Sequence, residues 1–160
     1  MFTLISGGET VVVSSGSTAD GDTVLAGGTL ELLSGATLGA VTFSSGSTLE
    51  VASGYVLSGG TLATGEIVQA GPGGSAVGQS ISATQTLAVL SGGTAKAVTL
   101  QSGGTLTVQA GGSALSLTVA SGAVASVTSG GYWSSTVVSS AGQDVVLAGG
   151  VVTSTIISNG

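Results

Sequence analysis

Few side chains in this sequence could carry out chemistry, and those that could are mainly acids and hydroxyls. Glu31 and Glu50 stand 19 residues apart, while Asp20 and Asp22 flank a glycine. A carboxylate pair could act as acid and base on a glycan, and carboxylate oxygens are ligands that calcium accepts. Each arrangement also has a plainer interpretation. The glutamates could form an acidic strip that discourages aggregation, and the aspartates could belong to a polar loop.

The residue types that are missing exclude several classes of function. The chain has no His and no Cys, and its only cation is Lys96 in a net charge of −6. It therefore lacks the groups for a thiol nucleophile, a Cys or His metal site or a Ser-His-Asp triad. One cation cannot neutralise a run of phosphates, so no nucleic-acid partner is expected. We expect no enzyme, no cofactor and no metal site.

The elements that must position these residues are strands. Hydrophobic residues make up 42% of the chain, and there is a single proline, which argues against a flexible linker. Glycine, valine, serine and threonine are poor helix formers. Runs rich in valine and threonine between glycines indicate short strands and tight turns. The apolar runs are far shorter than the ~18 residues of a membrane span, so this segment should not insert into a membrane.

An internal repeat of 19 residues runs along the whole sequence. Fifteen of the 17 positions in two series spaced by 19 are glycine, and the exceptions, Thr84 and Ala141, are small. The two series are Gly8, Gly27, Gly46, Gly65, Thr84, Gly103, Gly122, Ala141 and Gly160, and Gly16, Gly35, Gly54, Gly73, Gly92, Gly111, Gly130 and Gly149. Below, Gly8 begins the first repeat as position 1, and each 19-residue repeat is called a rung.

Four repeat positions are apolar in nearly every rung, namely positions 4, 6, 12 and 17. Positions 4 and 6 are two apart and so share one face of a strand. Position 4 contains Val11, Leu30, Leu49, Val68, Leu87, Leu106, Ala125 and the one exception, Asp144. Positions 3 and 16 are rich in threonine and should face outward.

These patterns predict an all-β fold, a single-stranded parallel β-helix (solenoid) of about eight 19-residue rungs. Each rung would contain about three short strands, and neighbouring rungs would pair in parallel about 4.8 Å apart. We expect a right-handed helix because parallel crossovers follow that hand. Residues 1–160 should form one β-helix repeat domain.

Two departures from the pattern have physical interpretations. Trp133 occupies position 12, and small residues surround it in the stack: Ala125 in the same rung and Ala114 in the rung before. This predicts volume compensation in a dense core. Asp144 breaks position 4 in the last full rung, as expected where the core opens to water. Tyr132, next to inward Trp133, should face outward, where it could stack on a sugar.

Segments 6–19 (SGGETVVVSSGSTA) and 91–95 (SGGTA) resemble the AIDA-type repeats of bacterial autotransporter adhesins. The resemblance implies a parallel β-helix passenger displayed on the bacterial cell surface. It also implies roles in adhesion to a host or cell-surface ligand, self-association and biofilm formation. Some such passengers are glycosylated on serine by dedicated heptosyltransferases, which implies a Ser-directed glycosyltransferase as a partner.

Position 8 would supply the glycan acceptors under this resemblance. Its serines are Ser15, Ser34, Ser53, Ser91 and Ser129. The alternative is that serine suits a turn before glycine, where it bonds to local backbone.

Our leading interpretation is therefore a non-enzymatic structural or adhesive module. A rigid spacer or stalk is the first alternative. A glycan-active β-helix enzyme is disfavoured because such enzymes gather several aspartates with basic residues in one groove. An ice-binding solenoid is disfavoured because position 5 interrupts the threonine array with Val12, Glu31 and Glu50.

A solenoid end is also a potential contact. Ile156 and Ile157 lie at the end of the repeat pattern and would be covered by a further rung. Terminal rungs expose unpaired N–H and C=O groups that can template strand addition. The sequence therefore predicts end-to-end association through these two residues.

Overall fold

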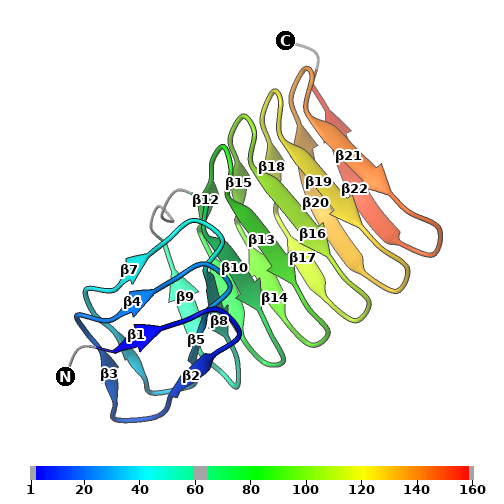
Figure 1. Ribbon diagram of the computed structural model, residues 1–160. Helices are drawn as coiled ribbons and strands as arrows, with labels where there is room; N and C mark the ends of the chain where they lie inside the picture. Colours follow the sequence, from blue (N-terminus) through cyan, green and yellow to red (C-terminus); the bar gives the residue numbers. More distant parts are fainter. Residues whose placement is uncertain (1–2, 60–64, 159–160) are drawn as a thin grey trace.

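The computed structural model describes residues 3–59 and 65–158 and is a stack of parallel rungs (Figure 1). The chain begins at one end of the stack and reaches the other, with short strands separated by turns in every rung. This confirms the predicted all-β parallel solenoid of about eight rungs.

One wall is an eight-stranded parallel sheet formed by repeat positions 3 to 6. Its alternating residues place an apolar side chain inward at every second position, which is why the burial alternates along each strand. Its strands, in spatial order, are β2 (Thr10–Val13), β5 (Thr29–Leu32), β8 (Thr48–Val51), β10 (Ile67–Ala70), β13 (Thr86–Val89), β16 (Thr105–Val108), β19 (Val124–Val127) and β21 (Gln143–Val146).

Shorter strands form the remaining walls. A nine-stranded sheet contains β9 (Val56–Ser58), β11 (Ser75–Val77), β12 (Ser80–Ile81), β14 (Thr94–Lys96), β15 (Thr99–Leu100), β17 (Ser113–Leu115), β18 (Thr118–Val119), β20 (Tyr132–Val138) and β22 (Val151–Ile157). In the first rungs the corresponding strands form two small sheets, β1 (Leu4–Ile5), β4 (Thr23–Val24) and β7 (Thr42–Phe43), and β3 (Thr18–Ala19) with β6 (Thr37–Leu38). The long strands β20 and β22 run through the corner that divides the shorter strands below them.

Every strand pair keeps the same register of 19 residues. Leu87 pairs with Leu106 and Leu106 with Ala125, and the same offset holds from the first rung to the last. Identical repeat positions therefore stack directly above one another, as the sequence period required.

The glycine series marks two corners of each rung. All 16 series positions that the structure describes have positive φ, including Thr84 (φ 68°) and Ala141 (φ 60°). Glycine predominates there because it adopts this conformation without a steric penalty. A third corner lies at position 14, where Ala97 (φ 53°) and Ser116 (φ 57°) are also left-handed.

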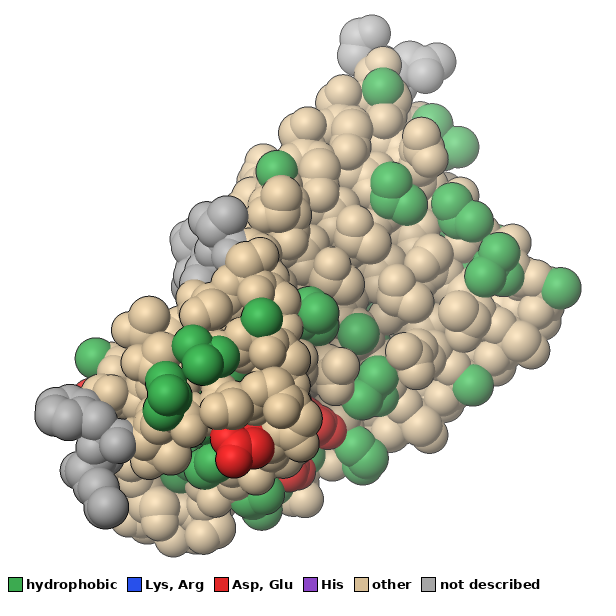
Figure 2. Space-filling model, in the orientation of Figure 1, with side chains coloured by type: hydrophobic (Ala, Val, Ile, Leu, Met, Phe, Trp, Pro, Cys, Tyr) green, Lys and Arg blue, Asp and Glu red, His purple; other side chains and the backbone are tan. Residues whose placement is uncertain are grey.

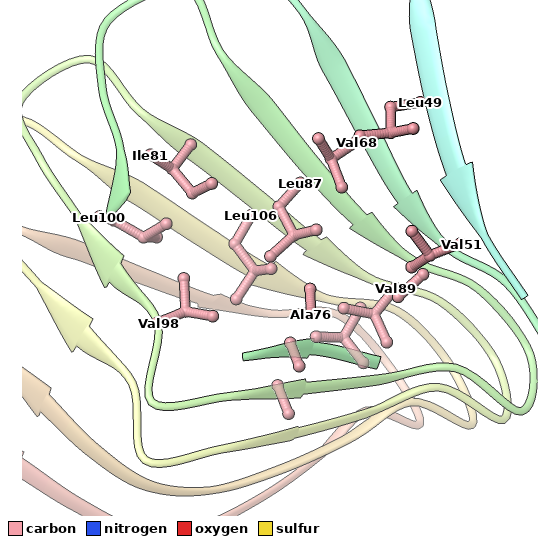
Figure 3. Packing of buried hydrophobic residues seen from close by; sticks show 14 of the residues in the cluster. Leu49, Val51, Val68, Ala76, Ile81, Leu87, Val89, Val98, Leu100 and Leu106 are labelled. Carbon is pink, nitrogen blue, oxygen red and sulfur yellow. The ribbon is translucent and has the colours of Figure 1, made fainter. Parts of the chain in front are cut away.

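The apolar core fills the interior along the whole stack (Figure 3). Leu49, Val68, Leu87 and Leu106 follow one another at position 4 in successive rungs and are at most 2% exposed. The predicted inward positions are thereby confirmed. Position 15 is a further inward position that the sequence analysis did not identify, and Val98 and Leu117 occupy it as fully buried residues.

The single tryptophan is accommodated as its small neighbours suggested. Trp133 is 0% exposed, pairs in register with Ala114 in the rung below, and shares its rung with buried Ala125. The described residues contain no helix of the length and apolar character needed to cross a membrane.

Candidate interaction surfaces

Glu31 and Glu50 are direct neighbours in the eight-stranded sheet. They pair in register on β5 and β8, and both are half-buried on the outward side. Burial, followed by the charge of Glu31, raises the pKa of Glu50. A carboxyl group with a raised pKa beside a second carboxylate is the pattern of a general acid–base pair. Here the same geometry places two like charges on adjacent strands, which weakens the sheet locally.

The two aspartates bond to the backbone of a neighbouring segment. The Thr3 backbone N–H donates to Asp22 Oδ1 over 2.9 Å, and the Ala40 N–H donates to Asp20 Oδ1 over 2.8 Å. Asp22 is buried, whereas Asp20 is exposed. The described part of the chain contains no cluster of three acidic side chains suited to a metal ion. The aspartates therefore tie the first rungs together, as in the polar-loop interpretation.

The five serines at position 8 line one corner of the solenoid and are all exposed. Each lies one residue before a left-handed glycine and against the corresponding glycine of the next rung. A Cβ added to Gly35 would lie 2.5 Å from Ser15 Oγ, and one added to Gly111 would lie 2.7 Å from Ser91 Oγ. Serine and glycine thus interlock between rungs, which gives the serine row a packing role in addition to its accessibility.

Tyr132 faces outward from β20, as expected, and is 38% exposed. Its hydroxyl lies 3.2 Å from Thr153 Oγ1 on β22. Hydrogen bonds with Thr153 and then Ser134 lower the pKa of Tyr132. The ring therefore belongs to a small polar group on the outer wall of the last two rungs.

The outward side of the eight-stranded sheet changes character along the stack. Six of the seven acids lie within residues 9–66, whereas residues 67–160 carry only Asp144 and Lys96 as charges. On the face shown in Figure 2, acidic side chains gather near the N-terminal rungs. Further along, hydroxyls replace them: Ser126 Oγ donates to Thr107 Oγ1 (3.2 Å) across β19 and β16. We call positions 3 and 5 of β13, β16 and β19 the hydroxyl face.

The last rung exposes the apolar residues that lower rungs bury. Val146 is 51% exposed whereas Val127, directly below it, is 0% exposed. Ile157 is 74% exposed, above Val138 at 4%. Ile156 is also exposed, but it continues an outward position rather than the core. The two isoleucines named by the sequence thus differ in orientation, and only Ile157 extends the core column.

Asp144 lies within the core column of this last rung, above Ala125. The residue is half-buried, but both carboxylate oxygens are shielded from solvent and have no hydrogen-bond partner among the described residues. Burial raises the pKa of Asp144. The expected opening of the core to water therefore does not reach this carboxylate.

Buried polar residues are the feature that sequence reasoning missed. Gln79 is 1% exposed at position 15, and its Nε2 donates to the carbonyl oxygens of Gly59 (2.9 Å) and Leu57 (3.1 Å). Ser47 and Glu66 are buried at position 2. Their polar side chains conceal both inward positions from a search for apolar periodicity.

The comparisons with known proteins agree with the repeat. Residues 88–142 match the family model described as "Adhesin of bacterial autotransporter system, probable stalk". The search of curated proteins gave no match. A solved structure of a hyper-glycosylated TibA fragment, whose glycosylation is catalysed by TibC, aligns with a TM-score of 0.38 and 16% identity, covering 99% of this chain and 94% of that one. A similarity at this level says nothing about function.

The family match covers rungs in which the register, the left-handed corners and the buried columns are all regular. The matched family is one of bacterial surface adhesins, a class of passenger domains that are typically non-enzymatic. The resemblance expected from the glycine-containing motifs is thereby confirmed. The chain is a parallel β-solenoid whose rungs between residues 88 and 142 are AIDA-type repeats of bacterial autotransporter adhesins.

Proposed function

We propose that this chain is a non-enzymatic module of a protein displayed on the bacterial cell surface, in which residues 1–160 act as one repeat domain. Its role is adhesion, through self-association or a host-surface ligand. The observation that carries the proposal is the hydroxyl face, a regular and nearly uncharged sheet surface built on a rigid core. Such a surface can form side-by-side hydrogen bonds with little desolvation of charge.

The size of this face sets the strength of the expected contact. Eight strands about 4.8 Å apart and four residues long span roughly 34 by 13 Å, or about 440 Å² on each partner. Stable complexes bury about 800 Å² per partner. One pair of modules should therefore bind weakly, and many copies on two facing cells would supply the avidity.

Cell aggregation is the appropriate assay for such a contact. Thr107→Glu with Ser126→Glu places charge on the hydroxyl face, and Thr118→Glu with Val137→Glu places the same charge on a different wall. The first pair should reduce aggregation of cells displaying the protein, whereas the second should not. Equal surface display is verified by antibody staining. Unchanged aggregation for the first pair would reject adhesion through this face.

A rigid stalk is the second candidate, because the matched family is described as a probable stalk. A stalk depends on the number of rungs but not on the side chains of one face. Removing rungs 5 and 6 (residues 84–121) as two whole repeats would preserve the register and shorten the rod by about 10 Å. A stalk should lose reach in proportion while tolerating the hydroxyl-face charges.

We also propose Ser15, Ser34, Ser53, Ser91 and Ser129 as acceptors for a Ser-directed glycosyltransferase. Their exposure along one corner supports this assignment. Intact-mass measurement of the protein from its native host, followed by peptide mapping, would test it. Glycan mass confined to other serines would refute the assignment to position 8.

A further inference from the structure

The last rung combines an exposed apolar surface with a buried charge. Its strands β21 and β22 pair with β19 and β20 on one side, and the described residues pair nothing on the other. Val146 and Ile157 extend two core columns into solvent. Asp144 extends a third, but with a carboxyl group where the seven preceding rungs carry valine, leucine or alanine.

A second copy of this chain offers a complementary surface at its first rung. Val11, Val13 and Ala19 occupy positions 4, 6 and 12 there, the same positions as Asp144, Val146 and Val152 in the last rung. Every rung pair in the chain is parallel with one register. Stacking the first rung of one copy on the last rung of another continues that register and buries apolar side chains against apolar side chains.

We propose that the last rung docks the first rung of a second copy of this chain, and that Asp144 restricts this docking to acidic conditions in which its carboxyl group is protonated. In the docked state, Asp144 would lie beneath Val11, without water. Burying an ionised carboxylate without a partner is strongly unfavourable, whereas the neutral acid costs far less. The proposal concerns the end of the rod and is independent of the hydroxyl face.

The surroundings of Asp144 leave its own protonation as the main switch. The strands beside it, β19 and β22, carry no titratable side chain, and β20 carries only Tyr132, which faces outward. Opposite it, β1, β2 and β3 carry none. Glu9, Asp20 and Asp22 lie in the loops of that first rung and add negative charge that opposes docking at neutral pH.

Head-to-tail docking leaves a free end on every assembly, so it yields open filaments rather than closed dimers. Static light scattering of the 160-residue chain should therefore give the monomer mass at pH 7. At about pH 5 the mass should rise with protein concentration. Because one pKa unit corresponds to a tenfold change, the association constant should rise by up to tenfold for each pH unit.

Asp144→Asn removes the titration while retaining the shape, and Asp144→Val restores the apolar column. We expect Asp144→Asn to lose most of the pH dependence, and Asp144→Val to associate at pH 7 at least tenfold more tightly than the wild type. If Asp144→Asn retains the wild-type pH dependence, the other acids control association and the proposed switch is wrong. A wild type that associates equally at pH 7 and pH 5 would also overturn it.

Two lysine variants of equal charge test the location. Ile157→Lys places a cation in the docking surface and should abolish association. Ile156→Lys, at the adjacent outward position, should leave it unchanged. Equal effects of the two variants would show that net charge, and not the end of the rod, controls assembly.

The partner surface is tested by mixing. Val11→Lys blocks the first rung, so neither it nor Ile157→Lys should assemble alone, but an equal mixture should form dimers at about pH 5. Circular dichroism confirms that each variant is folded. Dimers of Val11→Lys alone would indicate last-rung to last-rung contact and refute the head-to-tail arrangement.

Discussion

Replacing Leu106 by alanine should be far more damaging than replacing its neighbour Thr105. Leu106 is 0% exposed in the middle of β16, with Leu87 below and Ala125 above in the same column. Removing its side chain loses about 1.5–3 kcal/mol of transfer free energy, and the cavity adds to this loss. Ala125 is too short to fill the space, so we expect a cost of about 3–5 kcal/mol, in the upper part of the usual range.

Thr105 is the matched control because it is on the same strand but faces outward. Thr105→Ala should change the unfolding free energy by no more than about 0.5 kcal/mol. The assay is urea unfolding followed by fluorescence of the single tryptophan, which is fully buried one rung above. Similar unfolding midpoints for the two variants, at unchanged denaturant dependence, would refute the assignment of inward and outward positions.

Further predictions concern the core, the acidic pair and the corners. Ala125→Leu should destabilise by about 1–3 kcal/mol through overpacking against Trp133, and adding Trp133→Leu should recover part of this; additive effects in the double-mutant cycle would exclude compensation. The raised pKa of Glu50 means that the folded state holds this proton more tightly than the unfolded chain. Glu50 therefore stabilises the fold at acid pH and loses that contribution as the pH rises through the folded-state pKa. Glu50→Gln should reduce the melting-temperature gain between pH 7 and about pH 5, and an unchanged gain would contradict this. Thr84→Gly relieves a left-handed residue (φ 68°) and should stabilise by up to about 1 kcal/mol, as measured by thermal melting. Gly112→Ala would place a Cβ 2.6 Å from the Val89 carbonyl oxygen and should destabilise by about 1–3 kcal/mol, which the same melts would reveal.

The corners show how far a repeat pattern predicts backbone conformation. Glycine at two positions of the period correctly indicated left-handed residues, and Thr84 and Ala141 adopt the same conformation because their neighbours above and below enforce it. The third corner was not predicted. Ala97 and Ser116 carry side chains that normally avoid positive φ, so their residue types gave no indication of a turn there.

The core shows the same division between pattern and packing. Position 4 was predicted to be buried because its residues are apolar in seven rungs, and Leu106 in the structure confirms it. Position 15 was not, because Gln79 and Thr136 interrupt its apolar residues. Once a third corner turns the chain, these side chains face the interior, and Gln79 bonds to backbone carbonyls there.

The sequence alone determined the period, the parallel register and most of the core, because an offset of 19 residues stacks like residues and leaves apolar columns only one favourable side. The tertiary structure decided the environment of individual polar groups. Glu31 and Glu50 became neighbours through strand pairing, and the serines at position 8 came to pack against the glycines of the next rung. Asp144 came to point its carboxylate into an exposed apolar rung. A repeat specifies which residues lie above one another, but solvent access and hydrogen bonding depend on the side chains that surround each site in three dimensions.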